Sequence, residues 1–450
     1  MLGRKKVKGE VTAFLSLVFL LLLSFIGGVM ESASIQVSKN YKKTEMDLAM
    51  ESVFAEYQRE LLENYDIFAL EGTYETGSFS QQEIKKRLEY YGGAGMEQDF
   101  VRIQFLTDNG GQPFYEQIIR YMEEKTGTEK LQELLGNTEK WKTQEQEFGD
   151  RMDQVGKAES ESPELPKEEL LAKITNLKTS SLLEQIVPKT MILSTKQVEI
   201  SQQVSQRKLQ TGKGEFTNHK EENQGVSKML LGEYMVGHFG NAVQPKEKSR
   251  LSYEQEYLIG GKESDQENLE EVAKKLRLMR FASDYTYLMT DTVKQGEAEA
   301  MALTMTTVIA LPELAEIVKQ AILLGWAYGE SIVDLRALLK GNKVPLMKTT
   351  ESWQLSLAGL FTLGTGEGET EGVDTPGGLL YQDYLRMLLF LESKEALTMK
   401  ALDLVEQNLQ TTYNKAFFKA DHCISKLETR STCKLRRGIL FTFQTMNAYQ

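Results

Sequence analysis

The chain has 450 residues, of which 26% are charged, and it carries a formal net charge of −12. Residues 1–10 carry +3 and residues 11–30 carry none, so residues 31–450 carry −15. This acidic balance favours a soluble body and excludes the basic surface typical of a nucleic-acid-binding protein. Two cysteines exclude a disulfide-rich scaffold. The remaining length is enough for a large core in two lobes.

A run of twenty uncharged residues extends from Val11 to Met30. A helix of this length, rising about 1.5 Å per residue, spans the roughly 30 Å hydrocarbon core of a bilayer. The predicted membrane anchor comprises Val11, Phe14, Leu17, Phe19, Leu22, Phe25 and Met30. A cleaved signal peptide would have a shorter apolar core and a small-x-small cleavage site, whereas Glu31 adjoins the first small residues here. The sequence therefore favours a retained anchor over a cleaved signal.

Positive charges before the run predict the orientation of the chain. The topology residues are Arg4, Lys5, Lys6 and Lys8. The positive-inside rule makes residues 1–10 a cytoplasmic basic tail and residues 11–30 a transmembrane helix, with the bulk outside the cell. The predicted localisation is therefore the cell membrane, as a single-pass signal-anchor protein.

Residues 31–70 are predicted to continue the helix as an amphipathic stalk, because no proline or glycine occurs between Val29 and Leu70. Apolar residues recur there at helical spacing, and they define the predicted packing face: Met46, Met50, Val53, Tyr57, Leu61, Tyr65 and Phe68. This face either docks on the chain's own domain or forms a coiled-coil seam. The absence of strict heptads favours docking.

Punctuation by glycine, proline and charge divides the rest of the chain. Residues 71–155 are predicted to form a first extracellular segment, with a strand in "DFVRIQF" and then a charged helix. Residues 156–225 are predicted to be a linker and mobile loops. Residues 226–450 are predicted to form a mainly helical lobe, with a strand at 250–260, helices at about 264–294, 297–310, 312–340 and 377–418, and a C-terminal hairpin turning near 429–432. The fold class is α+β, mainly α, with a small antiparallel sheet.

Residue patterns for catalysis are missing from the sequence. The three histidines lack zinc spacing, and neither a nucleophile elbow nor a phosphate loop occurs. We therefore expect no enzyme and no cofactor. The loop at 364–378 carries a weak Ca²⁺ candidate made of Glu367, Glu369, Glu371 and Asp374, although such acidic loops are usually only solvated. Cys423 and Cys433 either form one disulfide or remain two free thiols.

Four stretches carry a resemblance to a known group of proteins. They are "KGEVTAFLSLVFLLLLSFIGGVMESASIQVSKNYKKTEMDLAMESVFAEYQRELLENYDIFAL", "EYLIGGKESDQENLEEVAKKLRLMRFASDYTYLMTD", "AILLGWAYGESIVDLRALLKGNKVPLMKTTESWQLSL" and "YQDYLRMLLFLESKEALTMKALDLVEQNLQ". The chain resembles a bacterial domain-of-unknown-function family of single-span membrane proteins, related to the TadE and TadG pseudopilin-like components of tight-adherence (Tad, Flp-type) pilus systems. The resemblance implies a surface or assembly component with protein partners in a pilus or secretion assembly. Processed pilins carry a Glu five residues after the cleaved Gly, where this chain has Phe14.

Two functions follow from these observations. The first is a membrane-anchored extracellular structural or assembly protein, pseudopilin-like, whose partners are the membrane and other proteins and not nucleic acid. The alternative is a membrane-tethered binding or sensing module for cell-wall or extracellular ligands. That alternative expects a pocket lined by the clustered tyrosines of "EYYGG", "YEQEY", "SDYTY" and "LLYQDY".

Overall fold

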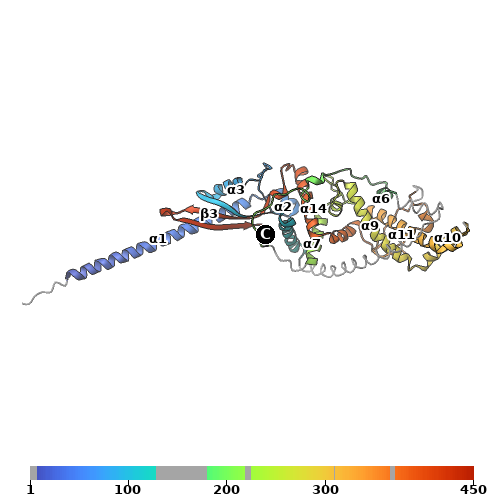
Figure 1. Ribbon diagram of the computed structural model, residues 1–450, viewed down its shortest axis with the longest axis horizontal. Helices are drawn as coiled ribbons and strands as arrows, with labels where there is room; N and C mark the ends of the chain where they lie inside the picture. Colours follow the sequence, from blue (N-terminus) through green and yellow to red (C-terminus); the bar gives the residue numbers. More distant parts are fainter. Residues whose placement is uncertain (1–7, 128–179, 218–223, 309, 365–369, 450) are drawn as a thin grey trace, which may run out of the picture.

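The computed structural model describes residues 8–127, 180–217, 224–308, 310–364 and 370–449. The molecule is elongated (Figure 1): α1 (Lys8–Phe54) projects from one end, a small sheet lies along the C-terminal part of α1, and a helical body forms the other end. This arrangement confirms the mainly helical α+β fold, with its long apolar N-terminal helix and small antiparallel sheet.

Helix α1 has 47 residues and is therefore about 70 Å long. The prediction of one continuous helix to Leu70 is wrong, because α1 ends at Phe54 and a separate helix, α2 (Arg59–Tyr65), follows it. Between them the backbone N–H of Gln58 donates to the carbonyl of Ala69 at 2.9 Å, which turns the chain back on itself. Helix propensity permitted continuation, but tertiary packing of α2 decided against it.

The sheet has four strands, all paired in antiparallel fashion: β1 (Leu70–Glu71), β2 (Met96–Phe105), β3 (Cys423–Lys434) and β4 (Leu440–Ala448). Strand β3 is central, with β2 along one side and β1 and β4 sharing the other. The predicted strand "DFVRIQF" lies within β2, and the predicted C-terminal hairpin is formed by β3 and β4. Its predicted turn was misplaced: residues 429–432 stay paired within β3, and the chain turns at Arg437 and Gly438, which have φ of 58° and 77°.

A first apolar core joins α1 to the sheet. Met46, Ala49, Met50 and Val53 of α1 are fully buried or nearly so, and they cluster with apolar side chains of β2 and β3. The short helix α3 (Gln81–Leu88) adds Ile84 and Leu88 to the same core. The C-terminal part of α1 is thus an integral element of the folded body.

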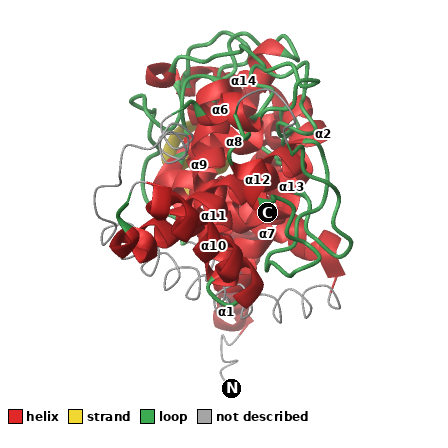
Figure 2. Ribbon diagram, turned by 90° about the vertical axis from the view of Figure 1, so that its right-hand side faces the viewer, coloured by secondary structure: helices red, strands yellow, loops and turns green. Residues whose placement is uncertain are grey.

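The helical body has its own, larger core. Its elements are α6 (Leu182–Ile186), α7 (Gln224–His238), α8 (Glu254–Gly260), α9 (Asp265–Leu288), α10 (Thr292–Val308), α11 (Ala315–Leu339), α12 (Leu357–Leu360), α13 (Tyr381–Leu391) and α14 (Lys394–Thr411), and residues 108–127 are also helical. Short helical turns lie at η1 (Glu89–Gly93), η2 (Ile200–Gln202), η3 (Pro312–Leu314), η4 (Ala420–His422) and η5 (Arg436–Gly438). Viewed along the long axis, helices fill the end of the molecule (Figure 2). Helices α9, α10 and α11 confirm the predicted blocks at 264–294, 297–310 and 312–340, whereas the block predicted at 377–418 is two helices, α13 and α14.

The strand predicted at 250–260 is wrong, because α8 occupies this position. Its carboxylates are buried and accept backbone hydrogen bonds: Glu254 from the N–H of Gly240 and Glu256 from that of Ala242, both at 2.9 Å. Because Glu254 and Glu256 are buried, the polar residues of α8 do not lie on one exposed face, and the helical periodicity is not visible in the sequence.

The interpretation of residues 180–217 as part of a linker with mobile loops is also wrong. Leu182, Ile186, Val198 and Val204 are buried in the large core. The guanidinium of Arg207 pairs with carboxylates of α14 and η4, at 2.6 Å to each. Residues 156–179 and 218–223, where that prediction also fell, lie outside the described residues.

Candidate functional site

The apolar segment of α1 projects from the folded body, and its side chains are largely exposed. Its predicted anchor residues are 53–71% exposed, and they are Val11, Phe14, Leu17, Phe19, Leu22, Phe25 and Met30. This is the one helix among the described residues that is long and apolar enough to cross a membrane, a property that a signal sequence shares. Arg4, Lys5 and Lys6 lie outside the described residues, as does the side chain of Lys8.

The predicted packing face divides between the two cores. Met46, Met50 and Val53 belong to the core of α1 and the sheet, whereas Leu61 and Tyr65 belong to the core of the helical body. Tyr57 and Phe68 lie between these groups and meet edge to face, with ring centroids 5.2 Å apart. The face docks on the chain's own domain, but it does so as two separate helices.

Strand β4 and the residues that flank it run beside the C-terminal part of α1, and four contacts join them in sequence order. They are the ion pair of Glu31 with Arg437, Lys39 Nζ at 5.4 Å from the ring centroid of Phe441, the hydrogen bond from Thr445 Oγ1 to Asp47 Oδ1 at 3.1 Å, and that from the Tyr449 hydroxyl to the Phe54 carbonyl at 2.5 Å. The turn between β3 and β4, residues 434–440, is hereafter the hairpin tip. These contacts hold the hairpin tip beside the end of the apolar segment (Figure 1).

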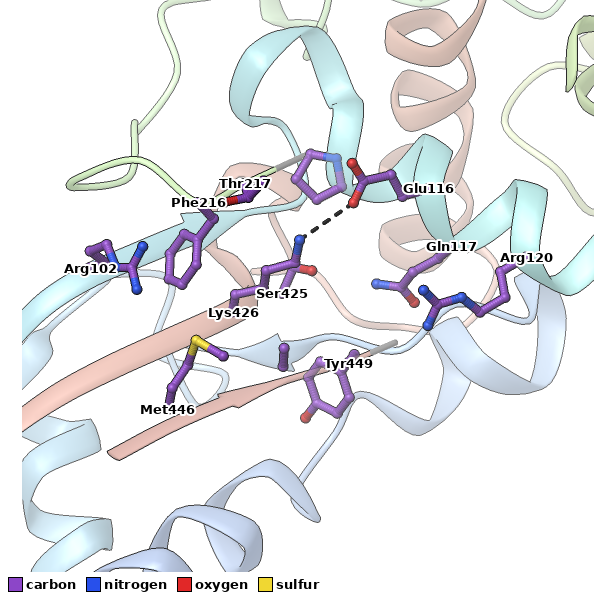
Figure 3. Close-up of a pocket in the computed structure, with 12 residues that line it drawn as sticks. Arg102, Glu116, Gln117, Arg120, Phe216, Thr217, Ser425, Lys426, Met446 and Tyr449 are labelled. Atoms are coloured by element: carbon purple, nitrogen blue, oxygen red, sulfur yellow. Dashed lines mark hydrogen bonds and ion pairs between the residues drawn. The ribbon is translucent and has the colours of Figure 1, made fainter. Parts of the chain in front are cut away.

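A pocket of about 460 Å³ lies between the helical residues 108–127 and the end of the sheet (Figure 3). Its charged lining is mainly basic, from Arg102, Arg120 and Lys426, with Glu116 opposite. Two of the bases already have partners, because Arg102 Nε donates to Glu428 at 2.5 Å and Lys426 lies 3.4 Å from Glu116. Most of the positive charge of this pocket is thus neutralised internally.

A second pocket of about 400 Å³ is lined by Glu60, Glu71, Glu75 and Lys415, among others. Lys415 pairs with Glu60 at 3.3 Å and with Glu75 at 2.6 Å, so the lysine of this pocket is paired. Glu71 instead accepts the backbone N–H groups of Thr73 and Glu75, at 3.0 and 2.8 Å. Each of these two pockets has a single lining tyrosine. They do not match the tyrosine-lined pocket that the binding-module alternative expects.

The clustered tyrosines serve mainly the helical core. Those of "YEQEY" and "LLYQDY" and the first of "SDYTY" are buried: Tyr253, Tyr257, Tyr285, Tyr381 and Tyr384. The hydroxyl of Tyr257 donates to Asp403 and that of Tyr381 to Glu256, each at 2.8 Å. Burial raises the pKa of Glu256 to about 7 and that of Asp403 to about 6, although these hydrogen bonds oppose the shift.

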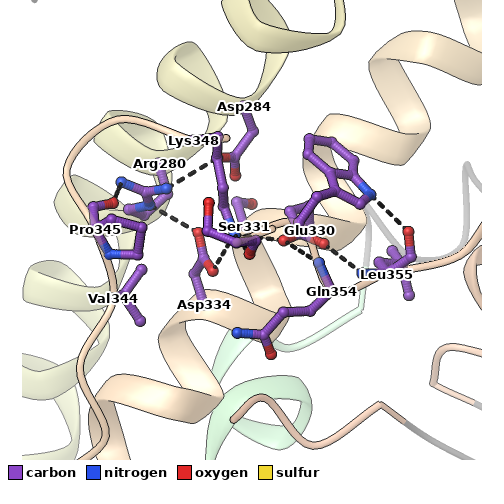
Figure 4. Close-up of polar contacts among 12 residues, drawn as sticks. Arg280, Asp284, Glu330, Ser331, Asp334, Val344, Pro345, Lys348, Gln354 and Leu355 are labelled. Carbon is purple, nitrogen blue, oxygen red and sulfur yellow. Dashed lines mark hydrogen bonds and ion pairs between the residues drawn. The ribbon is translucent and has the colours of Figure 1, made fainter. Parts of the chain in front are cut away.

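The densest group of charges lies inside the helical body (Figure 4). Arg280 of α9 donates to Asp284 at 3.0 Å and to Asp334 of α11 at 2.8 Å. Lys348 donates to Asp334 at 2.7 Å and also to Glu330. Glu330 accepts the backbone N–H groups of Gln354 and Leu355 at 3.0 and 2.7 Å. This group, hereafter the buried charge cluster (Arg280, Asp284, Glu330, Asp334, Lys348), fastens the chain after α11 to α9 and α11.

The buried charge cluster contains three carboxylates and two cations. Burial raises the pKa of Asp284 well above its usual range, despite the neighbouring Arg280. Burial alone would lower the pKa of Lys348, but the carboxylates of Asp334 and Glu330 raise it above its ordinary value. The contacts of the buried charge cluster are all internal, and we interpret it as structural.

Two residues of the Ca²⁺ candidate, Glu371 and Asp374, are described, and each has a partner within the protein. Glu371 pairs with Lys340, and Asp374 Oδ1 accepts the backbone N–H of Lys343 at 2.6 Å. Glu367 and Glu369 lie outside the described residues. Within the described chain, no group of three or more His, Cys, Asp or Glu side chains has the arrangement of a metal site.

The disulfide alternative is wrong, because Cys423 and Cys433 are both free and buried. They lie on one strand, β3, ten residues apart. At about 3.3 Å per residue their Cα atoms are roughly 33 Å apart, far beyond the reach of a disulfide. The prediction assumed a turn between them, whereas β3 continues through both.

Sequence reasoning missed the buried charge cluster and the hairpin tip. A signal for the cluster was present, since Arg280 with Asp284 in α9 and Glu330 with Asp334 in the more apolar α11 are each four residues apart. The hairpin tip had a weaker signal in "KLRRGIL", where three bases precede a glycine. Its proximity to Glu31 required the tertiary structure.

Comparison with known proteins gives a family. Residues 160–435 match the profile described as "Family of unknown function (DUF5702)". No curated protein and no solved structure matches the chain. The matched region includes helices α6 to α14 of the helical body and strand β3, and it leaves out α1, α2, α3, the helical residues 108–127, β1, β2 and β4. Because it covers more than half of the sequence, the chain belongs to this family of unknown function, DUF5702.

Proposed function

We propose that this protein is a single-pass membrane protein whose body lies outside the cell and acts as a structural or assembly component of a surface apparatus. The observation that carries the proposal is the contrast along α1. Residues 11–30 are exposed, apolar and uncharged, whereas Met46, Met50 and Val53 of the same helix are buried in the body. One helix thus passes from an apolar surface that water disfavours into a folded core.

Retention of the apolar segment does not follow from the fold alone. Cleavage after Met30 would remove the exposed part of α1 and would leave the docked part in place, so the fold permits both outcomes. What supports an anchor is the segment itself: twenty uncharged residues match the hydrocarbon thickness, and Glu31 adjoins the small residues that a signal peptidase would read. The bases before Val11 orient the body outward.

The assembly role rests on two features. The opening sequence resembles TadE- and TadG-like components, and the outer half of α1 packs on an antiparallel sheet, as the N-terminal helix of pilin-like proteins does. Phe14 stands where processed pilins have Glu, so we propose an accessory assembly component of a Tad-type pilus or secretion system instead of a filament subunit.

Membrane fractionation tests the anchor. We expect the full chain to resist extraction by carbonate, the body to be digested when protease is added to intact cells, and the mature N-terminus to precede Val11. The variant Leu17→Arg with Leu22→Arg places two charges within the segment and should release the protein from the membrane. Its control, Leu17→Val with Leu22→Val, should remain anchored. A mature chain that begins beyond Met30, or a body protected from protease, contradicts the proposal.

Co-purification tests the assembly role separately. The detergent-solubilised full chain should retain an ATPase or platform protein of a Tad-type system after cross-linking in cells. An anchored protein that purifies as a partnerless monomer contradicts the assembly role and leaves the anchor intact.

A further inference from the structure

The hairpin tip lies at the level where the apolar segment of α1 ends. Arg437 Nη1 pairs with Glu31, and Glu31 directly follows Met30, the last residue of the uncharged run. The hairpin points along α1 toward its N-terminal end (Figure 1). The headgroup layer on each side of a bilayer is about 5–7 Å thick, and one helical residue advances about 1.5 Å. If residues 11–30 fill the hydrocarbon core, Glu31 and its partner Arg437 lie in the headgroup layer.

The spacing of the other contacts supports this placement. From Lys39 to Asp47 is eight residues of helix, or about 12 Å, and from Phe441 to Thr445 is four residues of β4, or about 13 Å. The two distances agree, so β4 follows α1 without slippage between the second contact and the third. The position of the hairpin tip is thus set by the whole length of the strand and not by one exposed ion pair.

The charge of the hairpin tip is opposite to that of the body. Lys434, Arg436 and Arg437 are exposed, and residues 429–450 contain no Asp or Glu. Glu31 is the acid that the described structure pairs with the hairpin tip. Residues 31–450 as a whole carry −15, so this basic group stands out from an acidic surface. Phosphates of anionic lipids are the complementary charge available at this level.

An exposed apolar side chain accompanies these bases. Leu440 is 70% exposed, and Leu435 and Ile439 beside it are half-buried. Basic residues mixed with exposed aliphatic ones are typical of segments that lie in the bilayer interface, where the bases meet phosphates and the aliphatic groups enter the upper acyl region.

We propose that the hairpin tip binds the headgroups of anionic phospholipids in the outer leaflet, through Lys434, Arg436 and Arg437, with Leu440 inserted beside them. This inference rests on the proposed membrane anchoring. The lipid contact and α1 then form two attachments of one rigid unit, and together they fix the angle between the body and the bilayer.

The test uses the full chain in lipid nanodiscs and a tryptophan reporter at the hairpin tip, Leu440→Trp. Discs contain phosphatidylcholine alone or with about one quarter phosphatidylglycerol, and both contain a phosphatidylcholine brominated near the headgroup. The parent chain without the reporter supplies the background from its own three tryptophans. We expect bromine quenching of the reporter to be about twofold stronger in the anionic discs, and to weaken as salt rises from about 0.05 to 0.5 M.

A charge-matched pair of variants isolates the bases. In the reporter chain with the triple substitution Lys434→Gln, Arg436→Gln and Arg437→Gln, the bromine quenching of the tryptophan reporter should be equal in both discs. The control Lys208→Gln, Lys248→Gln and Lys262→Gln removes the same charge from exposed positions of the helical body and should keep the difference between discs. Equal quenching of the parent reporter in both discs, or an undiminished difference in the triple variant, overturns the inference.

Size-exclusion chromatography separates the two ways of failing. A chain that does not co-elute with the discs overturns the anchor and the lipid contact together. A chain that co-elutes while its reporter shows no lipid-dependent quenching overturns the lipid contact alone.

Discussion

Arg437, at the turn of the last hairpin, forms an ion pair with Glu31, the first residue after the apolar run of α1. The pair joins the two ends of the described sequence at the narrow end of the molecule. The Arg437 side chain is 75% exposed and that of Glu31 38%, and such surface pairs contribute only about 0–1 kcal/mol. The ion pair therefore contributes little to the stability of the hairpin, and the apolar core between α1 and the sheet must supply most of it.

Substitution of that core should show this directly. Met50→Ala removes a fully buried side chain of α1 and should lower the free energy of unfolding by about 2–4 kcal/mol. Leu48→Ala on the same helix is the control, because Leu48 is 56% exposed, and its effect should stay within about 0.5 kcal/mol. Urea unfolding of the detergent-solubilised full chain, followed by circular dichroism, measures both. Equal losses for the two variants would show that α1 is not docked on the sheet.

The buried charge cluster predicts a larger effect. Lys348→Met leaves Glu330 and Asp334 without their shared cation and should cost about 3–5 kcal/mol. Lys340→Met breaks a pair with Glu371, whose side chain is 71% exposed, and should cost less than about 1 kcal/mol. Tryptophan fluorescence during unfolding reports on this region, because Lys348 Nζ lies 5.9 Å from the ring centroid of Trp353, and Trp326 packs against Trp353. A loss below 1 kcal/mol for Lys348→Met would mean that the cluster does not fasten the chain after α11.

Glu256 predicts a pH dependence of stability. Its pKa rises from 4.5 to about 7 on folding, so between these values the folded protein keeps a proton that the unfolded chain has released. Stability is therefore highest below pH 4.5 with respect to this group, and it falls as the pH rises to 7, by about 3 kcal/mol in total. Above pH 7 the contribution no longer changes.

Glu256→Gln removes this titration. The decline in unfolding free energy between pH 5 and 7.5 should be shallower than in the parent protein, since an amide carries no ionisable proton. Glu263→Gln, at an exposed position, should leave the decline unchanged. Urea titrations across this range measure the slopes, and identical slopes for Glu256→Gln and the parent would refute the assignment.

The cysteines give a chemical prediction. Burial raises the pKa of the Cys423 thiol well above its usual range and also raises that of Cys433, so both thiols should react slowly with maleimide in the folded protein. After denaturation without reductant, mass spectrometry should find both thiols modified. A peptide containing Cys423 bridged to Cys433 would contradict the strand register of β3.

The long helices could be predicted because their apolar periods and lengths are local properties. Residues 312–340, for example, were expected to be helical, and α11 follows at Ala315–Leu339. The end of α1 could not be predicted, because no breaker marks Phe54 and the deciding contacts come from Ala69 and from Tyr449 near the other end of the chain. Helix α8 was misread for a related reason, since its buried acids are satisfied by backbone groups outside the helix.

The candidate site also has one part that local sequence predicts and one part that depends on tertiary contacts. The apolar run of α1 was visible in the sequence as twenty uncharged residues. The hairpin tip became visible only when β3 and β4 were placed beside α1, because Lys434, Arg436 and Arg437 look like ordinary surface bases when read in sequence. A disulfide between Cys423 and Cys433 requires a turn between them, and β3 instead continues through both residues.

The position of β3 in the chain determines when the sheet can form during synthesis. Every strand pairing of the sheet involves β3, and the helical body lies between β2 and β3 in the chain. A polypeptide that is synthesised from its N-terminus therefore exposes Met46, Met50 and Val53 until its final two strands have been made. Only a chain that extends through β4 can close this region, so premature termination leaves an intermediate with an open hydrophobic surface, which chaperones or proteases can recognise.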